Sequence, residues 1–260
     1  MSTAGPPADV VGRLRAAGCV FAEDEAALLV AAAGSPDELE QMVRDRVAGT
    51  PLEVVVGWAE FCGLRIVVRS GVFVPRLRTE LMARHATRLA GAGSVVVDLC
   101  CGTGAVGAVV RACVPGAEVY AADLDPAAVD CARHNLPPDR VLAGDLYDAL
   151  PGTLRGRVHV LACNAPYVPT GAIALMPPEA RDHEHRVALD GGADGLDVQR
   201  RVVAGAAAWL TPGGHLLVES SVAQAPVTAR LMDGAGLVAQ VVHDEEIGGT
   251  LVVGARPGPG

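Results

Sequence analysis

Residues 95–104 read Val-Val-Val-Asp-Leu-Cys-Cys-Gly-Thr-Gly, an apolar run that passes through one acidic residue into a loop with two glycines. The run Val95–Leu99 is short and rich in β-branched side chains, which is typical of a strand buried on both faces of a sheet. Gly102 and Gly104 then permit a tight turn in which a ligand can approach the backbone closely. The stretch therefore predicts a central strand followed by a ligand-binding loop.

Apolar runs alternate with helical stretches from this strand onward, which predicts a parallel sheet covered by helices on both faces. The first five strands are expected at Val95–Leu99, Glu118–Ala122, Val141–Ala143, Val158–Cys163 and His215–Glu219. Helices are expected between them, for example over residues 126–135 and 195–210. Leu237–His243 and Thr250–Gly254 are too close in sequence to enclose a helix, so they predict a hairpin whose last strand runs antiparallel. The expected fold class is α/β, a Rossmann-like sheet of seven mostly parallel strands.

The sequence pattern changes twice before this sheet begins. We therefore expect three parts: a small helical N-terminal domain (residues 1–49), a β-hairpin linker (50–80) and a ligand-binding domain (81–260). In the first part, Ser35 followed by Pro36 and two acidic residues is typical of a helix start. In the linker, Leu64–Val68 and Val72–Val74 flank Ser70-Gly71, and this arrangement predicts the two strands of the hairpin.

Composition and charge argue against several functional classes. The chain has 260 residues, of which 50% are hydrophobic and 20% charged, as in a globular protein. The net charge of −9 argues against a large nucleic-acid interface. Seven scattered cysteines without a C-x-x-C pair suit reduced thiols, and no apolar run is long enough to span a membrane. We therefore expect a cytoplasmic monomer with no membrane segment.

The glycine loop is compatible with two classes of ligand. Gly102 to Gly107 matches Gly-x-Gly-x-x-Gly, and Asp123 follows about twenty residues later, where an acid accepts hydrogen bonds from ribose hydroxyls. A nicotinamide dinucleotide fits this pattern, and so does S-adenosylmethionine (AdoMet). Asp98 favours AdoMet because an acid at the strand end suits a cationic amino group better than a pyrophosphate. Cys100-Cys101 also favour AdoMet, since they stand where the dinucleotide turn usually has its first glycine.

Asp145 and Leu146 follow the third expected strand. Asp145 is suited to accept a hydrogen bond from an adenine amino group, with Leu146 covering the ring. The residues expected to contact AdoMet are Asp98, Cys100, Cys101, Gly102, Thr103, Gly104, Asp123, Asp145, Leu146 and Asn164.

Asn164-Ala165-Pro166-Tyr167 follows the fourth expected strand and is suited to hold a planar NH2 group. The Asn164 side-chain oxygen can accept one N–H, and the carbonyl of Ala165 or Pro166 can accept the other. Tyr167 can pack its ring on the flat group. An amide nitrogen is a poor nucleophile, so an enzyme must orient it and stabilise the positive charge that develops on it. The stretch therefore predicts methyl transfer to an amide-like nitrogen, whereas a plain turn is the alternative.

At these residues the chain resembles the HemK/PrmC family of protein N5-glutamine methyltransferases, over residues 50–253. Besides the glycine loop and the Asn-Ala-Pro-Tyr stretch, the resemblance covers the linker up to Pro75-Arg76, Thr79-Glu80, and Ala188–Asp197. It implies a class I AdoMet-dependent methyltransferase fold. It also implies AdoMet as the methyl donor and a protein glutamine as the acceptor; the family's best-known acceptor is the glutamine of the Gly-Gly-Gln loop in peptide-chain release factors.

The resemblance implies a role for each of the matching site residues. The catalytic residues are then Asn164, Pro166 and Tyr167, and the substrate-binding residues are these three with Ala165 and Arg76. The N-terminal helices would present the partner protein. Three departures mark a divergent branch: Ala165 replaces the first proline of Asn-Pro-Pro-Tyr, Cys100-Cys101 replace small residues, and Leu77-Arg78 replace Pro-Glu.

Three alternative functions remain open at the level of sequence. Asn-Pro-Pro-Tyr also occurs in N6-adenine methyltransferases, which would need a basic surface and a route for an extruded base. The other two are a nicotinamide-dependent oxidoreductase and a cleft kept only for protein binding. His183 and His185 lack a third ligand nearby in sequence, so we expect a solvated loop and no metal there.

Overall fold

The computed structural model describes residues 8–258. The first seven residues of the expected N-terminal domain and the last two of the expected ligand-binding domain lie outside the described residues. Along the chain, the first part contains α1 (Ala8–Ala16), α2 (Ala22–Ala32), α3 (Pro36–Val47), α4 (Leu52–Val56), β1 (Trp58–Phe61), β2 (Leu64–Val67) and the 3-10 turn η1 (Leu77–Thr79). The second part contains α5 (Glu80–Leu89), β3 (Val95–Leu99), α6 (Ala105–Cys113), β4 (Glu118–Asp123), α7 (Pro126–Asn135), β5 (Val141–Ala143), β6 (Val158–Cys163), η5 (Thr170–Leu175), α8 (Pro178–His183), α9 (Asp197–Trp209), β7 (Leu210–Glu219), α10 (Ala225–Gly234), β8 (Val238–Asp244) and β9 (Gly249–Ala255).

The larger part is a seven-stranded sheet in the order β5-β4-β3-β6-β7-β9-β8. The five strands β3 to β7 pair in parallel, whereas β9 lies antiparallel between β7 and β8. The strand order reverses between β3 and β6, and ligands bind at such a switch point beyond the carboxyl ends of the strands. The α/β fold with seven mostly parallel strands, expected from the sequence, is therefore confirmed.

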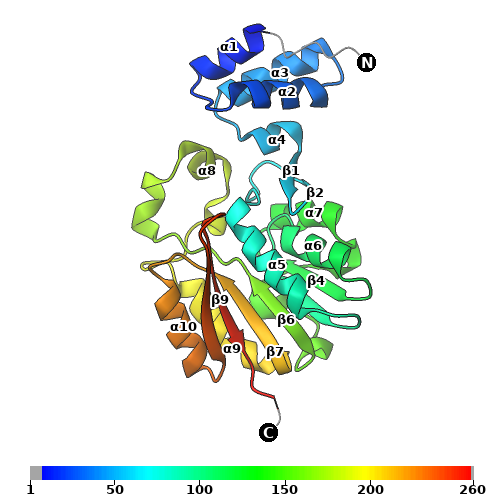
Figure 1. Ribbon diagram of the computed structural model, residues 1–260, viewed down its shortest axis with the longest axis vertical. Coiled ribbons are helices and arrows are strands. Elements are labelled where there is room, and N and C mark those ends of the chain that lie inside the picture. The colour runs from blue at the N-terminus through cyan, green and yellow to red at the C-terminus, as the bar shows by residue number, and fades with distance from the viewer. Residues whose placement is uncertain (1–7, 259–260) are drawn as a thin grey trace.

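Helices cover both faces of this sheet because successive strand residues point to opposite sides (Figure 1). Val96 packs into one core with residues of α5, α6 and α7. Val95 and Val97 pack into a second core with residues of α9 and α10. A strand that is apolar at almost every position is thus buried on both faces, as its composition predicts.

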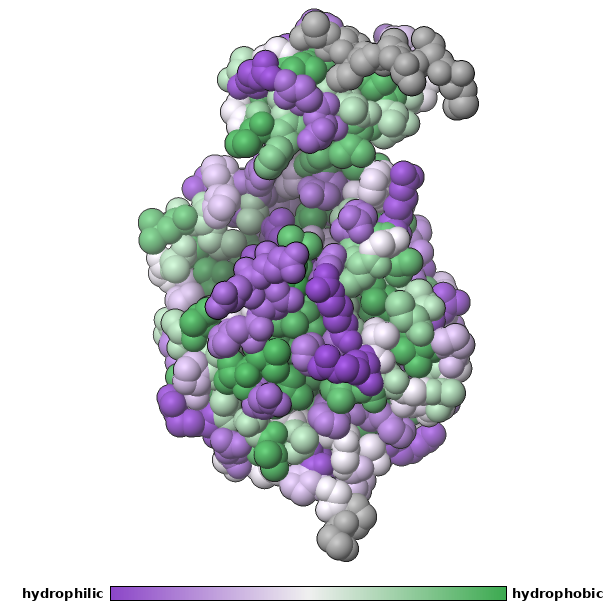
Figure 2. All heavy atoms as spheres, viewed as in Figure 1, coloured by the Kyte–Doolittle hydropathy of each residue, from purple (hydrophilic) through white to green (hydrophobic). Residues whose placement is uncertain are grey.

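The N-terminal helices α1, α2 and α3 form a separate small lobe with its own core around Leu14, Leu29 and Val43 (Figure 1). Ser35 begins α3 as expected, because its side chain accepts a hydrogen bond from the Glu38 amide at 3.2 Å. Figure 2 shows this lobe standing over a hollow in the larger α/β body.

The linker does contain a hairpin, but the expected strand pairing is wrong. β1 pairs with β2 around Cys62 and Gly63, which both have positive φ angles, 50° and 77°, as a tight hairpin turn requires. Residues 72–74 form no strand. Their backbone contacts a segment far ahead in sequence instead: the Val74 amide donates to Glu184 Oε1 at 3.1 Å. Within residues 8–258, no helix combines the length and apolarity needed to cross a membrane.

Candidate active site

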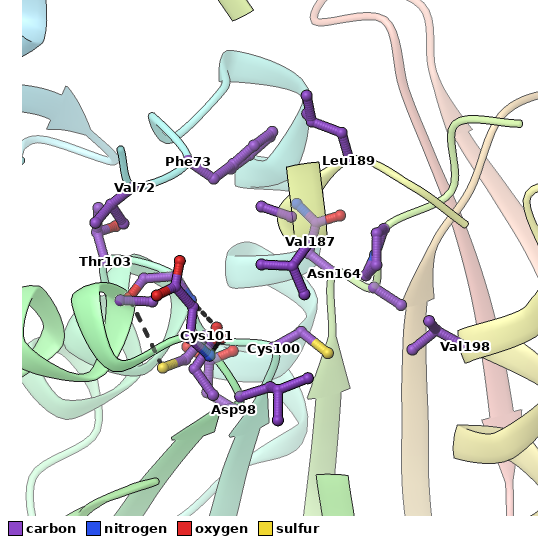
Figure 3. A pocket seen from close by; sticks show the side chains of 18 of the residues that line it. Val72, Phe73, Asp98, Cys100, Cys101, Thr103, Asn164, Val187, Leu189 and Val198 are labelled. Carbon is purple, nitrogen blue, oxygen red and sulfur yellow. Dashed lines mark hydrogen bonds between the residues drawn. The ribbon is translucent and has the colours of Figure 1, made fainter. Parts of the chain in front are cut away.

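A cavity lies at the carboxyl ends of β3, β4 and β6, beside the switch point of the sheet (Figure 3). Its walls come from the linker with η1, the glycine loop, the segments that follow β4 and β5, the Asn164–Tyr167 stretch, a covering segment (residues 168–189) and α9. Nearly all of the residues expected to bind AdoMet or the acceptor line it. They are Asp98, Cys100, Cys101, Gly102, Thr103, Asp123, Asp145, Leu146, Asn164, Ala165, Pro166 and Tyr167.

The glycine loop turns sharply between β3 and α6. Gly102 and Gly104 have φ angles of 54° and 74°, a left-handed conformation that costs a glycine little. A Cβ at Gly104 would also lie 3.0 Å from the Leu136 side chain. Gly107 is held by packing, since a Cβ there would lie 3.2 Å from Val119. The first two glycines thus shape the loop, and the third allows the helix to approach the sheet.

Asp98 lies beneath this loop with only 2% of its surface exposed. Its Oδ2 accepts a hydrogen bond from the Gly107 amide at 3.0 Å. Burial raises the pKa of Asp98 to about 7, because a charged carboxylate loses its hydration there. A ligand with a cationic group would favour the charged form and lower this pKa again.

Asp123 ends β4 beside the loop. Its two carboxylate oxygens accept hydrogen bonds from the amides of Gly102 and Asp125, each at 2.9 Å. Burial raises its pKa, and these hydrogen bonds act in the opposite direction. Each oxygen retains a second lone pair, so the carboxylate can also accept from the hydroxyls of a ribose.

Asp145 faces a residue that the sequence does not point to. Arg201, on α9, donates to Asp145 Oδ2 at 2.8 Å, and both residues line the cavity. Next to this pair, Leu146 is buried and adopts a positive φ of 50°. Asp145, which is expected beside the adenine, is therefore paired with an exposed arginine. No local motif predicts this pair, because α9 lies about fifty residues downstream.

The Asn164 amide is oriented by the 3-10 turn η1. Its Nδ2 donates to the Thr79 hydroxyl at 3.4 Å, which leaves Oδ1 as the group that can accept from a ligand. Thr79 also lines the cavity and is 5% exposed. Figure 3 shows Asn164 on the side of the cavity away from Asp98 and Thr103.

The backbone carbonyls of Pro166 and Tyr167, which follow Asn164, are directed away from the cavity. A Cβ on Gly191 would lie 2.7 Å from the Pro166 oxygen, and the Tyr167 oxygen accepts a hydrogen bond from Gln224 at 3.0 Å. Both carbonyls are therefore directed at neighbouring backbone or side chains. The Ala165 carbonyl remains as the better candidate for the second acceptor beside Asn164.

Arg76 occupies a different place from the one expected of a substrate-binding residue. Its guanidinium pairs with the buried Glu184 and lies 5.1 Å from the centre of the Phe73 ring. It is not part of the cavity wall, whereas Arg78, two residues later, is. Arg76 instead fastens the covering segment to the linker.

One histidine of the covering segment, His185, makes a similar contact with the rest of the cavity wall. His185 Nδ1 lies 2.6 Å from Asp125 Oδ2, and its backbone amide donates to the Gly71 carbonyl at 2.9 Å. Within residues 8–258, no group of three or more His, Cys, Asp or Glu side chains is placed to hold a metal ion.

The cysteines at the base of the cavity are uncharged. Cys100 lies at the loop with a positive φ of 53°, and a hydrogen bond with Cys163 followed by burial raises its pKa well above the usual value. Burial likewise raises the pKa of Cys101. These thiols act here as small, polarisable packing groups.

Comparison with known proteins agrees with this geometry. A family model described as the methyltransferase small domain matches residues 64–175. A release factor glutamine methyltransferase of Geobacter sulfurreducens is 33% identical over 231 residues, which cover 86% of this chain and 80% of that protein. A 4-amino-L-phenylalanine/4-methylamino-L-phenylalanine methyltransferase of Streptomyces pristinaespiralis is 37% identical over 71% of this chain and 65% of its own length.

A solved structure supports the fold. The 16S rRNA N2 G1207 methyltransferase of T. thermophilus, in complex with AdoMet and guanosine, superposes with a TM-score of 0.53 at 20% identity. The match covers 76% of this chain and 49% of that one. The identity with the protein of Geobacter sulfurreducens, and the length over which the two chains match, confirm the family expected from the motifs. The chain belongs to the release factor glutamine methyltransferase family.

Proposed function

We propose that this AdoMet-dependent methyltransferase transfers its methyl group to the side-chain amide of a glutamine in a protein, and that the protein is a peptide-chain release factor. The observation that carries the proposal is the orientation of Asn164. Its Nδ2 is engaged by Thr79, so its Oδ1 is the free acceptor at the carboxyl end of β6. An amide NH2 offers the two N–H donors that this oxygen and a neighbouring carbonyl would bind.

The residues beside β3 and β4 suit AdoMet. Asp98 is buried, and burial raises its pKa to about 7, so a cationic group beside it would stabilise the charged form. We infer that it accepts from the ligand's amino group and that Asp123 accepts from the ribose hydroxyls. AdoMet supplies an electrophilic methyl group when bound. We infer that Asp145 and Leu146 flank the adenine, with the Asp145–Arg201 pair at its edge.

The residues beside β6 would act on the acceptor nitrogen. We infer that Asn164 Oδ1 and the Ala165 carbonyl each accept one N–H, which points the nitrogen lone pair along the direction of attack. As the nitrogen becomes tetrahedral and positive, both acceptors bind it more strongly than in the ground state. The ring of Tyr167 would cover the flat amide and exclude water.

A protein partner suits the surroundings of the cavity. Leu77, Leu175 and Val187 are large apolar side chains with exposed fractions of 60%, 85% and 46%, on η1 and the covering segment. We infer that they contact the loop that carries the glutamine, and that the N-terminal lobe contacts the body of the partner. The name of the relative from Geobacter sulfurreducens supports a release factor as that partner.

An aromatic amine is the second candidate acceptor. The relative from Streptomyces pristinaespiralis is named for 4-amino-L-phenylalanine, so this sequence group is not restricted to one acceptor. An aniline NH2 would present the same two donors to Asn164 and Ala165. A nucleic-acid base is less well supported, because the chain carries a net charge of −9.

A labelling experiment tests the proposal. The full chain is incubated with tritiated-methyl AdoMet and the release factor of the same cell, and the labelled peptide is located by mass spectrometry. The control is a release factor whose Gly-Gly-Gln glutamine is replaced by alanine. Label on the glutamine of the wild-type factor alone is expected. Label that is unchanged in the control would overturn the release-factor assignment, and so would a parallel incubation with 4-amino-L-phenylalanine in which only that amine is labelled.

A further inference from the structure

The phenol of Tyr167 is fixed by two residues that come from elsewhere in the fold. Arg78 Nε donates to the Tyr167 hydroxyl at 3.0 Å. The Tyr167 hydroxyl in turn donates to Glu219 Oε1 at 3.1 Å, and Arg78 Nε lies 3.3 Å from the same oxygen. The three groups therefore form a closed triangle of polar contacts, defined here as the Tyr167 triangle.

The triangle joins three elements at the acceptor end of the cavity. Arg78 belongs to η1, Tyr167 follows β6, and Glu219 is the last residue of β7. Glu219 is only 2% exposed, and its backbone carbonyl accepts from Gln199 of α9 at 3.3 Å. The residue that holds the Tyr167 hydroxyl, Glu219, is therefore part of the central sheet. Arg78 connects Glu219 to the cavity wall.

Charge explains why this arrangement is stable. Burial, followed by the nearby Glu219 carboxylate, raises the pKa of Tyr167 to about 12, so its hydroxyl stays neutral and can donate. The guanidinium of Arg78 offsets the buried carboxylate of Glu219. Without Arg78, a buried carboxylate would keep only a neutral phenol as partner, which is costly.

The neighbouring residue of the same turn orients Asn164. Thr79 accepts from Asn164 Nδ2, and the preceding residue, Arg78, donates to Tyr167. A single 3-10 turn of three residues, Leu77–Thr79, thus contacts both side chains that would hold the acceptor.

We propose that η1 and Glu219 together set the geometry of Asn164 and Tyr167, which we call the acceptor clamp. In this proposal Arg78, Thr79 and Glu219 are positioning residues. Arg78 and Glu219 fix the plane of the Tyr167 ring, and Thr79 fixes which end of the Asn164 amide faces the acceptor. This proposal rests on the proposed function, since it assigns the clamp to the methylated group.

A double-mutant cycle tests the proposal. Single-turnover rates are measured for Arg78→Leu, Tyr167→Phe and the double variant, with the acceptor that the labelling experiment identifies. If Arg78 acts through the Tyr167 hydroxyl, each single variant loses about tenfold, and the double variant loses about tenfold rather than a hundredfold. Arg88→Leu, which replaces an exposed arginine on α5 outside the clamp, is the control and should keep its rate.

Independent losses would overturn the proposal: a hundredfold loss in the double variant would mean that Arg78 acts on the acceptor directly. The AdoMet dissociation constant should stay within about twofold in all variants, because the triangle lies at the acceptor end. Thr79→Ser, which keeps the hydroxyl, should retain the rate that Thr79→Val loses. An equal loss in both Thr79 variants would contradict its positioning role.

A spectroscopic measurement holds whichever acceptor is found. The chain has three tyrosines, so 3-fluorotyrosine labelling gives three fluorine resonances, and Tyr167→Phe identifies one of them. Arg78→Leu should move that resonance and leave the other two unchanged. No movement would contradict the proposal, whereas a labelled product other than a glutamine amide would contradict only the proposed function.

Discussion

At the scale of single residues, the cavity wall includes acidic and amide side chains from the ends of different strands. Asp98, Asp123 and Asn164 follow three different strands, and they meet because parallel strands bring their carboxyl ends to one edge of the sheet. The partners of such residues, such as Arg201 for Asp145, come from distant elements, and no local spacing encodes them. Arg76 shows the same limit: its partner, Glu184, lies more than a hundred residues away.

Asp123→Ala should weaken AdoMet binding at least about tenfold, because ribose hydroxyls would lose a charged acceptor and each such bond contributes about 1.5–3 kcal/mol. Calorimetry with AdoMet measures this loss. Asp123→Asn is the control, since it keeps one oxygen that can accept. A folded Asp123→Ala variant with wild-type affinity would remove Asp123 from the ligand site.

AdoMet affinity should rise as the pH increases through about 7. The pKa of Asp98 is raised to about 7 by burial, and a cationic ligand favours its charged form, so binding releases a proton below that pH. Titration calorimetry in two buffers of different ionisation enthalpy counts this proton. Asp98→Asn should abolish the release. The same proton release in wild type and variant would assign it to another group.

Ala165→Pro should be tolerated. No hydrogen bond from the Ala165 amide is found within the described residues, so proline removes no backbone bond, and the carbonyl that holds the acceptor remains. Ala165 is 1% exposed, and the ring must fit against the second core. Turnover that holds or rises is expected in a single-turnover assay. A fall of tenfold or more in a folded variant would show that this branch shapes its acceptor turn differently.

At the scale of elements, the sheet was predictable and the linker was not. Strands β3 to β6 and the last five residues of β7 contain short, mostly apolar runs, and such runs can be recognised in the sequence. The first residues of β7, 210–214, form no apolar run and were not expected in a strand. The linker contains several short apolar runs of similar character, and only long-range contacts select which of them pair. Residues 72–74 contact the segment around Glu184, so the strand they were expected to form is absent.

Gly195→Ala should lower turnover about tenfold or more. A Cβ at Gly195 would overlap the Tyr167 carbonyl oxygen and the Gln224 amide, which fix the end of the Asn164–Tyr167 stretch. Gly213→Ala is the matched control, because Gly213 has nearly the same φ, 80° against 78°, but open space around its Cβ position. Both variants carry the backbone strain. Equal rates in the two would show that the contact with Tyr167 is unimportant.

At the scale of the whole molecule, one arginine joins the N-terminal lobe to the covering segment. Arg46, on α3, pairs with Glu25 of α2 at 2.6 Å and with Glu179 of α8 at 2.7 Å. The side chains of Arg46 and Glu25 are only 10% and 12% exposed. The sequence predicted a helical lobe and a separate sheet, but it could not predict this contact between them.

Arg46→Leu should lower the free energy of unfolding by about 2–3 kcal/mol, because it leaves the nearly buried carboxylate of Glu25 unpaired. Urea unfolding measures the change. Arg44→Leu, which breaks the exposed pair with Glu40 on the same helix, should cost less than about 0.5 kcal/mol. Similar losses in both variants would mean that the nearly buried Arg46–Glu25 pair adds nothing beyond a surface ion pair.

The most direct measurement is the single-turnover rate of Asn164→Ala, taken together with its AdoMet dissociation constant. If Asn164 holds the acceptor nitrogen, methyl transfer should fall more than a hundredfold while AdoMet affinity changes only modestly. Gln240→Ala, an exposed amide on β8, is the control and should match the wild type. An Asn164→Ala variant that keeps more than a tenth of the rate would place the chemistry at another residue.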